Sequence, residues 1–95
     1  MTIKISKRAG TFAENKDIAR DIRERELIPG LKAGKTIVLD FDGVSGATQS
    51  FIHALISEPI REYGDNVFDS LVFKNCSNTV KEVINIVADY MQESE

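Results

Sequence analysis

The chain has 95 residues, 42% of them hydrophobic and 28% charged, and a net charge of −3, so it is long enough for one domain with a single core, which we expect to span residues 1–95. The charge has the wrong sign for a nucleic-acid-binding protein and is too small for a nucleic-acid mimic. The single cysteine excludes an internal disulfide. The sequence shows no secretory signal and no apolar run near the roughly 20 residues that span a bilayer, so we expect a cytoplasmic protein with no membrane segment.

The first third of the chain predicts two strands and a helix. Residues 2–6 (TIKIS) alternate between apolar and polar side chains, which predicts a half-buried strand, and residues 10–12 (GTF) indicate a further short strand. Apolar residues recur at helical spacing within residues 14–27. We therefore expect a helix there, and we expect Pro29 and Gly30 to end it.

The middle of the chain predicts a strand and a long helix. Residues 35–41 (KTIVLDF) are rich in β-branched side chains, which favour a strand. A turn follows, and Thr48 is placed to cap the N-terminus of the next helix. That helix carries Pro59, which lacks an N–H group, so we expect it to kink there or to restart with Ser57 or Glu58 as a new cap.

The last third predicts a strand at residues 69–75 (DSLVFKN) and a helix at residues 77–95, in which Thr79 and Glu82 have the spacing of a capping box. Side chains alternate between the two faces of a sheet, and this alternation gives the predicted strands one apolar face and one mixed face. Right-handed crossovers place successive helices on the same face. We therefore predict a small two-layer α/β sandwich. Its three- to four-stranded, largely parallel sheet would carry about three helices, mostly on the apolar face, and the mixed face would be open to water or to a partner.

One segment supports an enzymatic interpretation. The end of the predicted strand and the turn after it, residues 40–44 (DFDGV), resemble the first motif of the haloacid dehalogenase superfamily, in which two aspartates and magnesium transfer a phosphoryl group. The two aspartates would be Asp40 and Asp42. The further acidic ligands and the lysine or arginine of such a site are missing, and the chain is too short for a doubly wound five-stranded sheet. A magnesium-dependent phosphotransferase is kept as an alternative, beside the simpler interpretation that Asp40 ends a strand and Asp42 forms a turn.

The same region, taken whole, supports a different interpretation. Residues 38–55 (VLDFDGVSGATQSFIHAL) resemble the central segment of STAS domains, the sulfate-transporter and anti-sigma-factor-antagonist modules. Their pattern is a strand, then D-L-S-G-V, then a short loop that ends in D-S-S-G at the start of a helix. Residues 39–44 match the strand and turn, residues 48–50 (TQS) fall on D-S-S, and Phe51 falls on the glycine. A narrower resemblance, to compact STAS-like domains that have T-x-S-F here, covers most of the chain.

This resemblance implies a non-catalytic regulatory module that binds another protein through residues 43–50 and the start of the following helix. In STAS antagonists the second serine is phosphorylated by a partner kinase of the GHKL ATPase fold, and the phosphate blocks binding. Carried over by position, that serine is Ser50, and a phosphate there would lie near unpaired N–H groups of the helix. The site residues implied are Ser50, Thr48, Gly43, Ser45, Gln49 and Phe51. The competing interpretation makes Thr48 a simple helix cap and Ser50 a polar residue of the first turn.

The remaining residues suggest no further site. Arg20, Arg23 and Arg25 alternate with acidic residues, and these mixed signs predict a solvated helix face and not a phosphate site. His53 and Cys76 have no orienting partner in the sequence, so we expect no catalytic residue, metal or cofactor. A stand-alone inhibitor or adaptor on the same fold stays open, as does a homodimer formed through the mixed sheet face or an unpaired edge strand.

Overall fold

A computed structural model describes residues 1–93 of the chain, which contain two parallel sheets. The larger sheet has the strand order β1-β3-β5, formed by β1 (Thr2–Lys4), β3 (Ile37–Asp40) and β5 (Leu71–Lys74). The smaller sheet pairs β2 (Phe12–Ala13) with β4 (Gly46–Ala47). The GTF segment therefore does contribute a short strand, but this strand lies outside the main sheet.

The main sheet has one apolar and one open face, as the alternation of its residues predicts. Ile3 pairs with Leu39, and Leu39 pairs with Phe73, in a row that faces the core. Their sequence neighbours on the opposite face include Lys4 and Val72, both of which are exposed. The predicted two-layer α/β sandwich is therefore confirmed.

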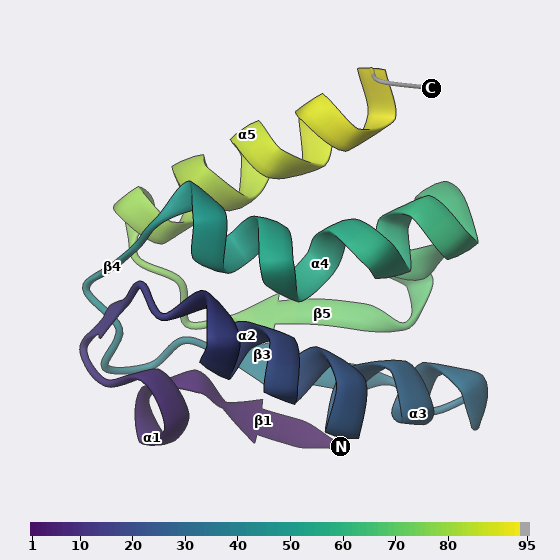
Figure 1. The fold of residues 1–95 in the computed structure, drawn as a ribbon, viewed down its shortest axis with the longest axis horizontal. Helices are drawn as coiled ribbons and strands as arrows, with labels where there is room; N and C mark the ends of the chain where they lie inside the picture. The colour runs from purple at the N-terminus through teal and green to yellow at the C-terminus, as the bar shows by residue number, and fades with distance from the viewer. Residues whose placement is uncertain (94–95) are drawn as a thin grey trace.

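Within residues 1–93, the helices cover the apolar face of the main sheet and leave the other face open. In Figure 1, α2 (Lys16–Ile22) lies in front of the sheet, α4 (Gln49–Tyr63) lies beside α2 and above β5, and α5 (Asn78–Glu93) lies alongside α4. The shorter α1 (Ile5–Ala9) follows β1, and a 3-10 helix, η2 (Gly64–Asp69), leads into β5. The predicted end of the final helix, at residues 94–95, lies outside the described residues.

The first strand is shorter than predicted, because β1 ends at Lys4 and the chain turns into α1. The partner strand explains this difference. Lys4 pairs with Asp40, the last residue of β3, and beyond Asp40 the partner chain turns away. Ser6 consequently has no neighbouring strand to pair with, and it lies in the helix.

The prediction that Pro29 and Gly30 end the helix expected at residues 14–27 is wrong. A π-helical turn, η1 (Arg23–Leu27), follows α2, and α3 (Ile28–Lys32) continues directly from it. Pro29 lies in the first turn of α3, where a missing N–H group is tolerated. The segment stops at Gly34, whose positive φ of 76° suits the residue that follows a helix.

The two long helices have N-terminal caps that differ in how well the sequence predicts them. Thr48 caps α4 as predicted, because its Oγ1 accepts a hydrogen bond from the Phe51 amide at 3.1 Å. This helix then continues through Pro59, so of the two predicted alternatives, a kink or a restart, the restart is wrong. The cap of α5 is Ser77, whose Oγ accepts from the Val80 amide at 3.2 Å, and the predicted capping box at Thr79 is therefore wrong.

Candidate functional site

The turn that leaves β3 is organised by Asp40. Its Oδ1 accepts a hydrogen bond from the Asp42 amide at 2.9 Å and another from Asn75 Nδ2 at 3.0 Å. The bond from Asn75, followed by that from the Asp42 amide, lowers the pKa of Asp40. Val44 N donates to Phe41 O at 2.9 Å and closes the turn. One oxygen of Asp40 thus holds the turn and ties it to the end of β5, which supports a structural role for this aspartate over that of a nucleophile.

The loop of residues 43–48 is held in place by hydrogen bonds to two other segments of the chain. The amide and the hydroxyl of Ser45 both donate to the carbonyl of Thr11, at 2.8 and 3.0 Å. The amide of Thr48 donates to the carbonyl of Ala13 at 3.0 Å. Ser77 Oγ donates to the carbonyl of Ser45 at 3.3 Å, so the cap of α5 also anchors this loop. The loop is therefore an ordered surface, built jointly with the β2 region and α5.

Phe12 lies against this loop, and sequence reasoning did not single it out. The residue is 50% exposed, and a Cβ at Gly46 would approach its Cε1 to 2.9 Å. Glycine at position 46 therefore allows the aromatic ring to lie over the loop backbone. The only signal in the sequence was the short GTF strand, and nothing there indicated that β2 would pair with β4. Exposed aromatic side chains of this kind are common anchors in protein interfaces.

The first turn of α4 separates the predicted site residues into two groups. Gln49 and Ser50 are exposed, whereas Phe51 is fully buried in the core. The prediction that Phe51 contributes to a binding surface therefore needs correction: its ring packs inward and fixes the orientation of the helix start. Gly43 and Ser45 are exposed and Thr48 is half-buried, so these three flank the two exposed residues of the turn.

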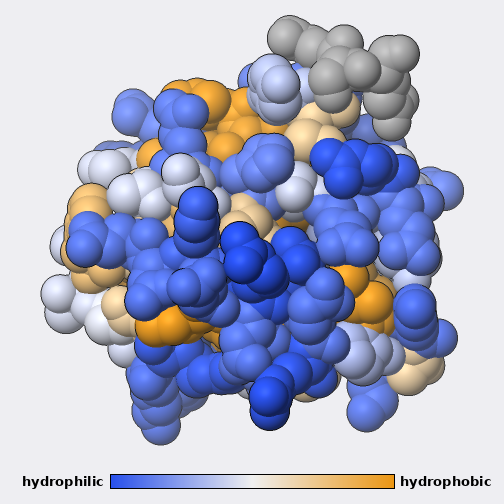
Figure 2. Space-filling model, viewed as in Figure 1, coloured by the Kyte–Doolittle hydropathy of each residue, from blue (hydrophilic) through white to orange (hydrophobic). Residues whose placement is uncertain are grey.

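A groove with a volume of about 680 Å³ runs beside Ser50, between α2, α4 and α5. Its polar lining includes four cationic side chains and a single carboxylate, that of Glu58. Exposed apolar side chains of α5 line the opposite wall. Figure 2 shows strongly hydrophilic surface in the middle of this face, over α2 and α4, and hydrophobic surface above it, over α5. The cations that line the groove are Lys16, Arg20, Arg23 and Arg61.

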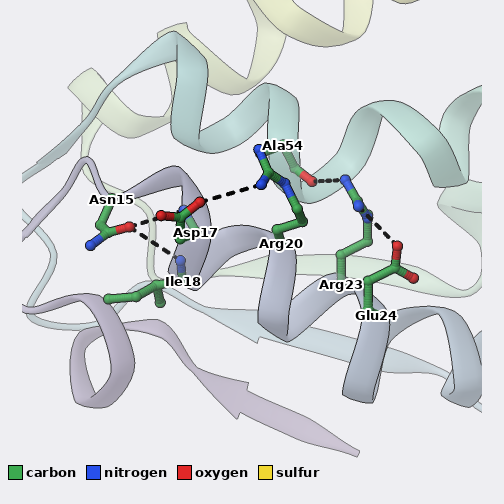
Figure 3. A network of polar contacts seen from close by, with 7 residues as sticks. All are labelled: Asn15, Asp17, Ile18, Arg20, Arg23, Glu24 and Ala54. Atoms are coloured by element: carbon green, nitrogen blue, oxygen red, sulfur yellow. Dashed lines mark hydrogen bonds and ion pairs between the residues drawn. The ribbon is translucent and has the colours of Figure 1, made fainter.

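Arg23 anchors the floor of the groove. Its side chain is only 13% exposed, and its Nη1 donates to the carbonyl of Ala54 at 2.9 Å. Nη2 contacts Glu24 Oε1 at 2.9 Å, and the buried Nε faces Glu58 Oε2 at 3.2 Å without the geometry of a hydrogen bond. Figure 3 shows Arg20 and Arg23 both extending toward α4.

The prediction that the three arginines form one solvated face is therefore wrong for Arg23. It fits Arg25, whose side chain is 79% exposed and pairs with Asp21 at 2.7 Å. The π-helical turn begins at Arg23, and the helical packing directs that residue onto α4. Mixed charge in the sequence does not distinguish an arginine that faces a neighbouring helix from one that faces water.

The single histidine and the single cysteine of the chain line different hollows of the surface. His53 is exposed and lines the groove, and burial raises the pKa of the half-buried Cys76 thiol. Within residues 1–93, histidine, cysteine and carboxylate side chains form no group of three or more that could hold a metal ion. None of the helices in this described part of the chain combines the length and apolar character needed to cross a membrane.

One comparison with known proteins gives a match, and it agrees with the fold. A family model described as "STAS-like domain of unknown function (DUF4325)" matches residues 19–81, well over half of the chain. The match extends from α2 to the first turn of α5 and includes β3, the 43–48 loop, α4 and β5. No curated protein and no solved structure matches the chain significantly.

Proposed function

The chain belongs to the family of STAS-like domains, and on this premise we propose that it is a non-catalytic regulatory module that binds a partner protein. The binding surface consists of the 43–48 loop, the exposed residues Gln49 and Ser50, and the neighbouring ring of Phe12. The partner is an ATPase or kinase of the GHKL type, and its kinase activity phosphorylates Ser50. Phosphorylation then weakens binding.

The observation that carries this proposal is the position of Ser50. Its side chain is exposed in the first turn of a 15-residue helix, directly after a loop held by hydrogen bonds to Thr11, Ala13 and Ser77. A kinase can reach an exposed hydroxyl of this kind. A partner that rests on the ordered loop would contact the same hydroxyl.

The electrostatic setting favours a phosphate at this position. A negative charge near a helix N-terminus gains about 0.3–1 kcal/mol from the helix dipole. Ser50 also lines the groove that contains Lys16 and Arg20. Phosphorylation adds a charge of about −1.5 to −2, which is large enough to change which partner surface fits against this turn.

Two measurements test the proposal. The chain is incubated with a GHKL-type kinase and Mg²⁺-ATP, and the product is mapped by mass spectrometry; phosphate is expected on Ser50 and absent in Ser50→Ala. Ser70→Ala is the matched control, since Ser70 lies away from the loop, between η2 and β5. An active kinase that leaves Ser50 unmodified would refute the proposed phosphorylation.

The binding surface is tested separately by biolayer interferometry with that kinase. Ser45→Arg and Gln49→Arg each place a bulky charge on the surface and should reduce binding by at least about tenfold, equivalent to about 1.4 kcal/mol. Lys32→Glu alters an exposed lysine at the end of α3 and should bind as the parent does. Unchanged binding by both loop variants would refute the assigned surface.

A further inference from the structure

We infer that the groove between α2, α4 and α5 binds an acidic, amphipathic peptide segment of a partner protein. This inference deepens the proposed function and rests on it, because Gln49 and Ser50 belong both to the proposed surface and to the groove. The groove would hold a segment of the partner whose remaining surface contacts the loop.

The charge of the groove is the reverse of that of the whole chain. The chain carries a net charge of −3, yet the lining has four cations and one carboxylate. That carboxylate, Glu58, faces Arg23, which also contacts Glu24, so Arg23 adds no excess charge. The positive excess comes from Lys16, Arg20 and Arg61. Arg20 pairs with Asp17 at 3.3 Å, but both side chains are more than half exposed, and such pairs exchange readily with water and ligand. The local excess of positive charge favours carboxylates in the occupant.

The opposite wall favours an apolar contact. Ile86 is 49% exposed and Tyr90 is 61% exposed, and both line the groove. They are four residues apart on α5, so they share one face of that helix. Large side chains exposed side by side in this way leave water-accessible apolar area that a leucine or phenylalanine of a partner could cover.

The dimensions fit a short helical or extended segment. The floor helix α4 has 15 residues and is therefore about 22 Å long. The groove volume of about 680 Å³ is large enough for a row of side chains from such a segment. A peptide with carboxylates on one face and an apolar anchor on the other matches both walls, in the manner of helix-in-groove recognition.

This inference explains how phosphorylation of Ser50 weakens the binding of the partner. Ser50 lies on the lining, so a phosphate there places negative charge inside the groove. That charge repels the carboxylates of an acidic peptide and offsets the cations that attract them. An acidic partner segment is therefore released when Ser50 is phosphorylated.

The test is a titration of the isotope-labelled chain with a 14-residue glutamate–leucine peptide of helical periodicity, followed by NMR and fluorescence anisotropy. We expect chemical-shift changes in the α2, α4 and α5 residues of the groove. Arg20→Glu, Arg61→Glu and Tyr90→Ser should each weaken binding at least about fivefold. Lys32→Glu should leave it unchanged, and circular dichroism confirms that each variant is folded.

The comparison ligands decide the class of occupant. A lysine–leucine peptide of the same pattern and an oligothymidine of similar length should both bind at least about tenfold more weakly. Equal binding of the lysine peptide, preferred binding of oligothymidine, or no binding of the glutamate peptide at millimolar concentration would each overturn the inference. In those cases, continued loss of kinase binding by Ser45→Arg would show that the proposed function stands without the groove.

Discussion

Replacing Arg23 with methionine is the sharpest test of how the groove is assembled. Methionine keeps much of the apolar stem and removes the guanidinium, so packing is largely preserved. The variant loses the hydrogen bond from Nη1 to the Ala54 carbonyl and the ion-pair contacts with Glu24 and Glu58. The α2 and η1 segment should consequently be less firmly attached to α4.

The expected loss in the free energy of unfolding can be worked from these contacts. A hydrogen bond from a charged donor contributes about 1.5–3 kcal/mol. Glu24 and Glu58 are 55% and 45% exposed, so their ion pairs together add no more than about 1 kcal/mol. We expect a loss of about 2–3 kcal/mol, which for a chain of this length lowers Tm by about 10–20 °C.

Urea denaturation followed by circular dichroism measures this loss, and Arg25→Met is the matched control. Arg25 lies two residues further along the same π-helical turn, but it is 79% exposed and makes a single i,i+4 pair with Asp21. Its replacement should cost no more than about 0.5 kcal/mol. Equal destabilisation by the two variants would refute the argument that Arg23 anchors α4.

Three further outcomes test the loop and its supports. Thr48→Ala should lower the free energy of unfolding by about 1 kcal/mol through loss of the cap on Phe51 N, and Thr48→Ser should restore it in urea melts. Gly43→Ala should cost about 1–2 kcal/mol by thermal melting, because φ is 82° there although the added Cβ meets no atom closer than 3.6 Å. Asp40 has a lowered pKa, so its contribution to stability is present above the ordinary aspartate pKa and is lost as pH falls through its folded value. Asn75→Ala removes the main cause, so NMR titration should show the Asp40 midpoint rising; an unchanged midpoint would contradict it.

The sheet was predictable because its signal is local. The alternation within residues 37–40 identifies the inward-facing side chains, and β-branched residues identify the strand. The end of β1 was not predictable in the same way, because it depends on where its partner strand β3 stops. The continuation of the helix past Leu27 was also not predictable, because nothing in the sequence indicated the π-helical turn after which Pro29 falls in the first turn of α3, where its missing N–H group is tolerated.

Of the candidate site, the sequence predicted only the position of Ser50 and the loop before it. The resemblance to STAS domains placed Ser50 at a helix start, and the structure places it there with its side chain exposed. The groove could not be predicted, because Arg20, Arg61 and Tyr90 come from three helices that meet only through the topology. Phe51 was misjudged because the resemblance alone made it a site residue, although its i,i+4 spacing with Leu55 already indicated the buried face of the helix.

The small sheet formed by β2 and β4 has a consequence for the kinetics and thermodynamics of association. Its hydrogen bonds fix the backbone beside Ser45 before any partner arrives. A partner therefore contacts a backbone that is already ordered, and little conformational entropy is lost at that contact when the complex forms. No folding step precedes the encounter there, so changes in affinity at this surface should be expressed in the lifetime of the complex more than in its rate of formation.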